Sequence, residues 1–169
     1  MGFIWTILSV RVPFCATCGA KPWLMGTIPR HSAGVALAAT NTIMPTNNRV
    51  LIVEDDPTAL SGYVEFLIAE GFEPTGVPNG AAALPIALGS PPAAVVTDIT
   101  LPGMTGFELA AALRADSRTQ RIPIIGLTAH WSAEVHTRAR DVAMQVILSK
   151  PCIPAHLVAE LNRVLAARH

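Results

Sequence analysis

Charged residues, long apolar runs and paired cysteines are all scarce in this 169-residue sequence. Only 14% of the residues are charged, and twelve Lys and Arg balance twelve Asp and Glu, so no basic field would attract a nucleic-acid backbone. Although 51% of the residues are apolar, no run approaches the roughly 18 residues that a membrane-spanning helix needs. The three cysteines cannot complete a disulfide framework, which favours a reducing, cytoplasmic compartment.

The balanced total charge conceals two unlike stretches of sequence. Residues 1–48 contain three cations and no acid, whereas residues 49–169 contain nine cations and twelve acids. In the second stretch, strand-like apolar runs alternate with amphipathic segments, while the first stretch keeps no regular period. We therefore predict one folded domain over residues 49–169, preceded by a poorly ordered extension over residues 1–48.

Other interpretations of residues 1–48 are open. The apolar run over residues 3–10 suggests a signal peptide, but no cation precedes it and Arg11 follows it. Cys15 opens a C-x-x-C pair that could be half of a zinc site, but no second Cys or His pair lies at ligand spacing. Because Met44 stands just before the regular pattern, the extension could also result from a start assigned too early.

Five strand-like and five helix-like segments alternate along the domain. The predicted strands cover residues 50–53, 73–77, 93–97, 122–127 and 146–149. The predicted helices begin at residue 57 and then cover residues 81–88, 107–114, 133–144 and 155–167. Strict alternation with short connections predicts an α/β fold, in which a parallel sheet carries helices on both faces.

Proline and apolar residues refine this prediction. Pro74 lacks an amide donor, which restricts its strand to the edge of the sheet. Pro85 lies inside a predicted helix and is expected to kink or shorten it. The first helix is expected to face the core with Leu60, Val64, Leu67 and Ile68. The last helix is expected to do so with Leu157, Leu161, Val164 and Leu165.

Polar side chains follow four of the predicted strands, at the point where each strand ends. They are Glu54 and Asp55 after the first strand, Asp98 after the third, Thr128 after the fourth and Lys150 after the fifth. In an open parallel sheet, ligands bind outside the carboxyl ends of the strands, at the topological switch point. We therefore expect these five groups to converge in one crevice.

The residue types in this crevice indicate its chemistry. Three carboxylates brought together repel one another, and Mg²⁺ is a suitable compensation because it accepts a few carboxylates, keeps water and binds phosphate oxygens. Lys150 would supply positive charge for a phosphoryl group, and Thr128 would add a hydroxyl donor. A carboxylate can itself attack phosphorus and form an aspartyl phosphate. Each residue alone could be a helix cap, loop or surface group, but their joint placement favours a site.

Four motifs carry a family resemblance. They are the acidic opening VLIVEDDP at residues 50–57, the loop DITLPGMTG at residues 98–106, the triplet LTA at residues 127–129 and the triplet SKP at residues 149–151. Together they resemble the receiver domain of the two-component response regulators. The resemblance covers residues 49–169 and implies a flavodoxin-like, doubly wound sheet of five parallel strands in the order 2-1-3-4-5.

The resemblance also implies roles for the acidic residues. Asp98 would be the phosphoacceptor, taking a phosphoryl group from a histidine kinase or a histidine phosphotransfer protein. Asp55 and Asp98 would bind Mg²⁺ directly, together with the backbone carbonyl of Thr100, while Glu54 would act mainly through water. The protein would then not be an enzyme in the usual sense, apart from slow self-dephosphorylation.

For the remaining motifs, the resemblance implies that Lys150 contacts the phosphoryl group and that Thr128 swings towards it on activation. It further implies a cis peptide bond between Lys150 and Pro151, which proline makes accessible. His130 occupies a position that tunes phosphoryl lifetime in the family, although a solvent-facing role is equally open.

Several positions depart from the family pattern. Ile147 stands where an aromatic residue commonly reports activation, Thr105 where Asp or Asn is usual, and Ala143 where a glycine often precedes the last strand. Pro74 and Pro85 are also unusual in the second strand and helix. None of these departures removes a group needed for phosphorylation, so they concern how the signal is passed on.

Three functions are compatible with the sequence. The leading one is a stand-alone phosphorylation switch that signals to an effector protein, without direct contact with nucleic acid or membrane. Only 19 residues follow Lys150, which are too few for a DNA-binding module. The second is an aspartate-nucleophile phosphohydrolase, although Thr100 stands where a second acid would be needed. The third is a receiver-like binding module that works without phosphorylation, which Ile147 permits.

Overall fold

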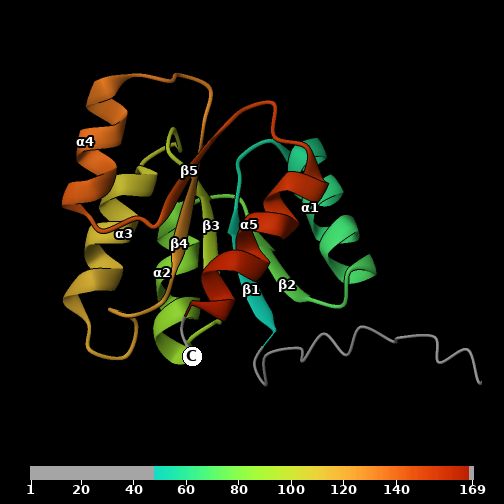
Figure 1. Ribbon diagram of the computed structural model, residues 1–169. Coiled ribbons are helices and arrows are strands. Elements are labelled where there is room, and N and C mark those ends of the chain that lie inside the picture. Colours follow the sequence, from blue (N-terminus) through green and yellow to red (C-terminus); the bar gives the residue numbers. More distant parts are fainter. Residues whose placement is uncertain (1–47, 168–169) are drawn as a thin grey trace, which may run out of the picture. The chain divides into compact units, whose positions relative to one another are not determined.

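The computed structural model describes residues 48–167, so the interpretations offered for the N-terminal extension lie, apart from Asn48, outside the described residues. Strands and helices alternate as expected (Figure 1). The strands are β1 (Arg49–Val53), β2 (Glu73–Val77), β3 (Ala94–Asp98), β4 (Ile124–Thr128) and β5 (Val146–Ser149). The helices are α1 (Pro57–Ala69), α2 (Gly80–Gly89), α3 (Gly106–Ala115), α4 (Ala133–Asp141) and α5 (Pro154–Ala166).

The strands form one parallel sheet in the order β2-β1-β3-β4-β5, which confirms the predicted fold class and order. β2 pairs only with β1 and lies at the edge, where Pro74 stands opposite Val50. This edge position was expected, because proline cannot donate to a second neighbouring strand. The order reverses between β1 and β3, so a topological switch point lies between these two strands.

Helices cover both faces of the sheet, and each face has its own apolar core (Figure 1). Successive side chains of β1 alternate between them: Val50 and Ile52 pack with α1 and α5, whereas Leu51 and Val53 pack with α2, α3 and α4. Burial on both faces explains why the strands are continuous apolar runs rather than alternating ones. Each fully buried aliphatic side chain contributes about 1.5 to 3 kcal/mol.

Helix α1 corrects one expectation about the core. The side chain of Ile68 is 59% exposed, whereas Tyr63 is 6% exposed and packs in the core of the α1 and α5 face. The buried residues of α1 are Tyr63 and Leu67, which lie one turn apart on the same face of the helix. Ile68 lies beside this face. The four residues predicted to be buried in α5 are buried.

Several element ends shift by one residue from the predicted ones, and three boundaries have a clear physical cause. β4 begins at Ile124 rather than Ile122 because Pro123 intervenes without an amide donor. Helix α2 is not shortened by Pro85 but extends from Gly80 to Gly89, aided by Asn79, whose side chain accepts a hydrogen bond from the amide of Ala82.

Within residues 48–167, no helix has both the length and the apolarity to cross a membrane.

The third boundary is the end of α4, which lies at Asp141 rather than Met144. There the chain turns through Ala143, a non-glycine residue with a φ of 53°. The amide of Met144 donates to the carbonyl of Ala139 at 2.8 Å, and the amide of Ala143 donates to that of Arg140 at 2.9 Å. These two bonds form a Schellman cap, which normally places glycine at the left-handed position.

We expect Ala143→Gly to stabilise the protein. A left-handed alanine costs about 1 to 2 kcal/mol, and the extra freedom that glycine gives the unfolded chain offsets part of this, so we expect a net gain of about 0.5 to 1 kcal/mol. Urea unfolding measures the change. The control is Ala111→Gly in the interior of α3, which should destabilise by about 1 kcal/mol. A loss of stability in Ala143→Gly would contradict the expected relief of strain.

Candidate functional site

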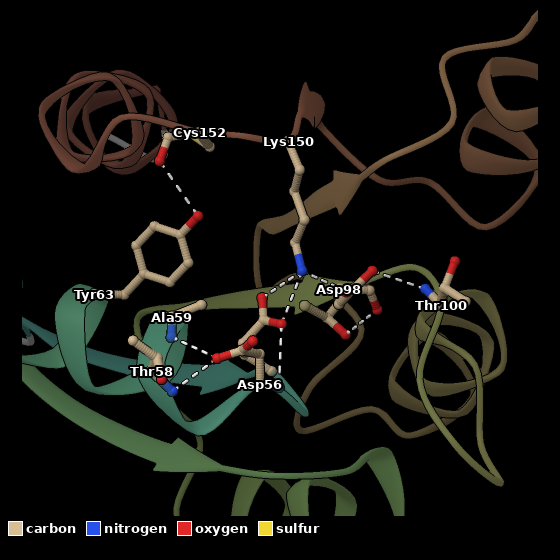
Figure 2. Close-up of polar contacts among 10 residues, drawn as sticks. Asp56, Thr58, Ala59, Tyr63, Asp98, Thr100, Lys150 and Cys152 are labelled. Atoms are coloured by element: carbon tan, nitrogen blue, oxygen red, sulfur yellow. Dashed lines mark hydrogen bonds and ion pairs between the residues drawn. The ribbon is translucent and has the colours of Figure 1, made fainter.

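The predicted site residues meet at the carboxyl edge of the sheet, and the strand register explains why. Val53 pairs with Thr97, so Glu54 and Asp98, the next residue on each strand, lie level with each other. On the other side, Thr128 pairs with Ser149, which precedes Lys150. Figure 2 shows Lys150 reaching from the end of β5 towards Asp98. The switch point between β1 and β3 is therefore the centre of the site.

Glu54, Asp55 and Asp98 form an acidic cluster in which one oxygen of each carboxylate lies within 4.8 Å of the others. Glu54 and Asp98 are buried, at 1% and 6% exposure, whereas Asp55 is exposed. The cluster is thus open to solvent on the side of Asp55. These oxygen atoms are the kind of ligand that a hard divalent cation prefers, so the residues present fit a metal site.

Lys150 joins the two buried carboxylates. Its Nζ donates hydrogen bonds to Glu54 Oε1 at 2.8 Å and to Asp98 Oδ2 at 2.5 Å (Figure 2). Glu54 Oε2 is buried and accepts no hydrogen bond, although it lies 2.6 Å from the same Nζ as an ion pair. The cluster therefore contains three carboxylates, of which Glu54 and Asp98 pair with the ammonium of Lys150, and its excess of negative charge is one that a divalent cation would compensate.

The pKa values of Glu54 and Lys150 depend first on burial and then on the contacts with neighbouring charges. Burial raises the pKa of Glu54 above its ordinary value of 4.5, and the nearby charge of Asp98 adds to the rise, while Lys150 acts against it. Burial also opposes the charged form of Lys150, but hydrogen bonds to Asp98 and Glu54 outweigh this effect and raise its pKa. Two carboxylates favour the charged form of Lys150, whereas Lys150 alone favours the charged form of Glu54.

The loop after β3 holds Asp98 in place. Asp98 Oδ1 accepts a hydrogen bond from the amide of Thr100 at 2.8 Å. A Cβ on Gly106 would collide with the carbonyl oxygen of Asp98, so only glycine fits at that position. Thr105 then caps α3, since its side chain and that of Glu108 each accept a hydrogen bond from the other's amide. The amide of Thr100 contacts the carboxylate, and the metal-binding role of its carbonyl stays a prediction.

Thr128 is engaged within its own loop. Its hydroxyl donates to the carbonyl of His130 at 3.0 Å and accepts from the amide of His130 at 3.1 Å, while the side chain of His130 is exposed. The carbonyl of Thr128 accepts a hydrogen bond from the amide of Lys150 at 2.7 Å. The backbone thus links the predicted hydroxyl donor to the predicted phosphoryl contact, while the hydroxyl itself bonds to the backbone of His130.

Ile147 is half-buried and packs against the core between the sheet and α2, α3 and α4. A Cβ on Gly126 would lie 2.6 Å from Ile147 Cδ1 and 3.0 Å from Ile99 Cδ1, so the side chain of Ile147 fills space left by this glycine in the adjacent strand. The bond between Lys150 and Pro151 is cis, as the family resemblance implied.

Sequence reasoning missed two residues beside the site, Tyr63 and Cys152. Together with Glu54, Ala59 and Lys150 they line a cleft of about 440 Å³ that also contacts Asp56 and Pro151. The hydroxyl of Tyr63 donates to the carbonyl of Cys152 at 3.3 Å (Figure 2). The only signal in the sequence was the position of Tyr63, four residues before Leu67 on the same helical face.

Comparison with known proteins identifies related sequences. The family described as "Response regulator receiver domain" matches residues 50–162. Protein PilH of Pseudomonas aeruginosa is 30% identical over 118 residues, which cover 70% of this chain and 98% of PilH. The transcriptional regulatory protein PrrA of Mycobacterium tuberculosis is 33% identical over 123 residues, or 73% of this chain and 52% of PrrA. The chain therefore spans about half the length of several curated relatives that it matches.

Solved structures show the same likeness. The chemotaxis protein CheY4 of Vibrio cholerae is 30% identical, with a TM-score of 0.67 over 70% of this chain and 98% of CheY4. The receiver domain of the sensor histidine kinase PA1611 from Pseudomonas aeruginosa is 28% identical, with a TM-score of 0.66 over 71% of this chain and 98% of that domain. That structure is described as having a magnesium ion coordinated in the active site cleft.

We expect Glu54→Gln to remove a pH-dependent contribution to stability in the absence of divalent cations. Because the folded-state pKa of Glu54 is raised, its contribution is fully present below pH 4.5 and is lost as the pH rises through the raised value. Each unit by which the pKa is raised corresponds to about 1.4 kcal/mol. Relative to the native chain, the variant should therefore become more stable as the pH rises.

Urea unfolding with EDTA between about pH 4 and pH 7 measures this difference. The same substitution at the exposed Glu65 of α1 controls for the change in net charge. A difference between native and Glu54→Gln proteins that stays constant with pH, or that changes with the opposite sign, would show that burial does not dominate at Glu54.

Proposed function

The chain belongs to the response regulator receiver family of two-component signalling, and we propose that Asp98 is its phosphoacceptor. The phosphoryl group would come from the phosphohistidine of a histidine kinase or a histidine phosphotransfer protein. One observation carries the proposal: Asp98 lies buried at the end of β3, with Oδ1 held by the amide of Thr100 and Oδ2 by the ammonium of Lys150. A carboxylate fixed in this way is oriented before the donor arrives.

In the proposed reaction, an oxygen of the Asp98 carboxylate attacks the phosphorus of the donor. The new P–O bond forms an acyl phosphate, and the P–N bond to the donor imidazole breaks. The proton already carried by the other nitrogen of that ring lets it leave as neutral imidazole. Lys150 would move its ammonium from the carboxylate to the oxygens of the transferred group and stabilise their charge. Its raised pKa keeps this group charged at neutral pH.

We propose Mg²⁺ as the cation of the acidic cluster. Asp55 and Asp98 would bind it directly, with the carbonyl of Thr100, and Glu54 would contact it mainly through water. When bound, Mg²⁺ would neutralise charge on the phosphoryl oxygens. The proposal is supported by the oxygen-only donor set, by the excess of carboxylates over ammonium groups and by the similarity to a magnesium-bound receiver domain.

We propose that the output passes through contacts with a downstream effector protein. The hydroxyl of Thr128 would leave His130 and turn to the phosphoryl group, which would shift the population of conformations of the β4–α4 loop. The proposal includes a cytoplasmic location, which the odd number of cysteines favours. It includes no direct contact with nucleic acid.

We expect a small phosphodonor and Mg²⁺ to label the native chain with one phosphoryl group that hydroxylamine removes. Asp98→Asn should abolish this labelling, because an amide is not a nucleophile of this kind. The control is Asp56→Asn, which keeps an N-cap for α1 and changes a neighbouring carboxylate in the same way. Equal labelling of native and Asp98→Asn proteins would contradict the proposal, and rapid multiple turnover of a phosphomonoester would favour a phosphohydrolase instead.

We expect Mg²⁺ to stabilise the folded chain by about 2.7 kcal/mol at one hundred times its Kd, because it binds the folded state alone. Asp55→Asn removes an oxygen ligand of the cluster and should lose most of this gain. Asp56→Asn should keep the gain, since Asp56 caps α1 and lies outside the acidic cluster. Urea unfolding with and without Mg²⁺ measures both effects. An equal gain in the native and Asp55→Asn proteins would place the metal elsewhere.

A further inference from the structure

Tyr63 is the single tyrosine of the sequence and connects two segments that are 89 residues apart. It lies in α1, is 6% exposed and packs in the core between the sheet and α5. Its hydroxyl donates to the carbonyl of Cys152, a residue of the same core, at 3.3 Å (Figure 2). Phenylalanine would satisfy the packing, so the hydroxyl group is the part of Tyr63 that packing leaves unexplained.

The bond reaches the segment that begins with Lys150. This segment is held at its first residue by the hydrogen bond from the Lys150 amide to the Thr128 carbonyl, and two residues later by Tyr63. Between these points the chain passes through Pro151, which has no amide donor of its own. The two bonds therefore fix the backbone on both sides of the residue whose side chain enters the site.

Tyr63 also belongs to the site's own cleft. Its side chain lines the same 440 Å³ cleft as Glu54 and Lys150. Burial raises the pKa of its hydroxyl, so the group keeps its proton and remains a donor at neutral pH. A shift of the backbone after Lys150 would move the ammonium relative to Asp98, and reactive groups lose rate steeply when misplaced by about 1 Å.

We propose that Tyr63 is a positioning residue for phosphoryl transfer. Its hydroxyl anchors the backbone after Lys150 and thereby holds the ammonium between Glu54 and Asp98. The inference rests on the proposed function, because it assigns Tyr63 a part in the reaction of Asp98. It requires that the hydroxyl act through Lys150 rather than through the general stability of the fold.

The test compares Tyr63→Phe with the native chain in the rate of phosphorylation by a small phosphodonor at saturating Mg²⁺. We expect the rate to fall by about threefold to tenfold, the effect of losing one hydrogen bond that orients a charged group. The affinity for Mg²⁺ should change by less than about twofold, since the carboxylates lie directly after β1 and at the end of β3 and not on the anchored segment. An unchanged rate, or an equal loss of Mg²⁺ affinity, overturns the inference.

Thr119→Val is the matched control for stability. The hydroxyl of Thr119 is fully buried and donates to the carbonyl of Leu113 at 2.8 Å, between α3 and β4 and away from the site. Its loss removes the same kind of hydrogen bond, so it should lower stability without changing the rate of phosphorylation. If Thr119→Val slows phosphorylation as much as Tyr63→Phe does, the effect is a general loosening and the inference fails.

A double-mutant cycle tests the route through Lys150. In a Lys150→Ala background, Tyr63→Phe should cause no further decrease in rate, because no ammonium remains to be positioned. The same proportional decrease in both backgrounds overturns the inference while the proposed function stands. Absence of acyl phosphate in the native chain itself overturns the proposed function, and the inference with it.

Discussion

The structure depends on a shortage of positive charge: within residues 48–167, Lys150 alone pairs with the two buried carboxylates at the ends of β1 and β3. Glu54 and Asp98 lie side by side because Val53 pairs with Thr97, and in water-poor surroundings their mutual repulsion is costly. Lys150 lowers the pKa of Glu54 but does not restore it to its ordinary value, because burial raises this pKa most and the charge of Asp98 adds to the rise. Removing one partner of such a cluster leaves buried charge without compensation, which costs several kcal/mol.

The parallel sheet makes this arrangement possible and also supports it. All five strands end at the same edge, so residues from sequence positions 54 to 150 meet there. The acidic cluster forms because β1 and β3 are neighbours in the sheet, although β2 separates them along the chain. Apolar cores on both faces hold the strands in register, and a slip by one residue would exchange the two faces of β1. The packing of residues that carry no chemistry therefore fixes the distances within the acidic cluster.

The sequence was sufficient to predict the fold and the composition of the site, because both depend on local patterns. Uninterrupted β-branched runs indicate strands buried on two faces, and the polar residue after each run then falls at the shared edge. The predictions that were wrong concern features that depend on tertiary packing and on the backbone conformation at a helix end. Ile68 has the right spacing for burial, but the face of α1 that packs in the core contains Tyr63 and Leu67 instead. The Schellman cap at Ala143 likewise overrides the apolar pattern that extended α4 to Met144.

The site contains two kinds of residue: those with charged or hydroxyl groups, and the core residues that keep these groups in position. Charged and hydroxyl groups of the site could be found from residue type and order, since their chemistry is visible in the sequence. Their supports could not, because the hydrogen bond from Tyr63 to the Cys152 carbonyl and the packing of Ile147 into the space above Gly126 use ordinary core residues. In a site built on excess negative charge, such supports decide where the one ammonium lies. Departures from the family pattern at core positions therefore bear on the reactivity of the site as directly as changes to its carboxylates.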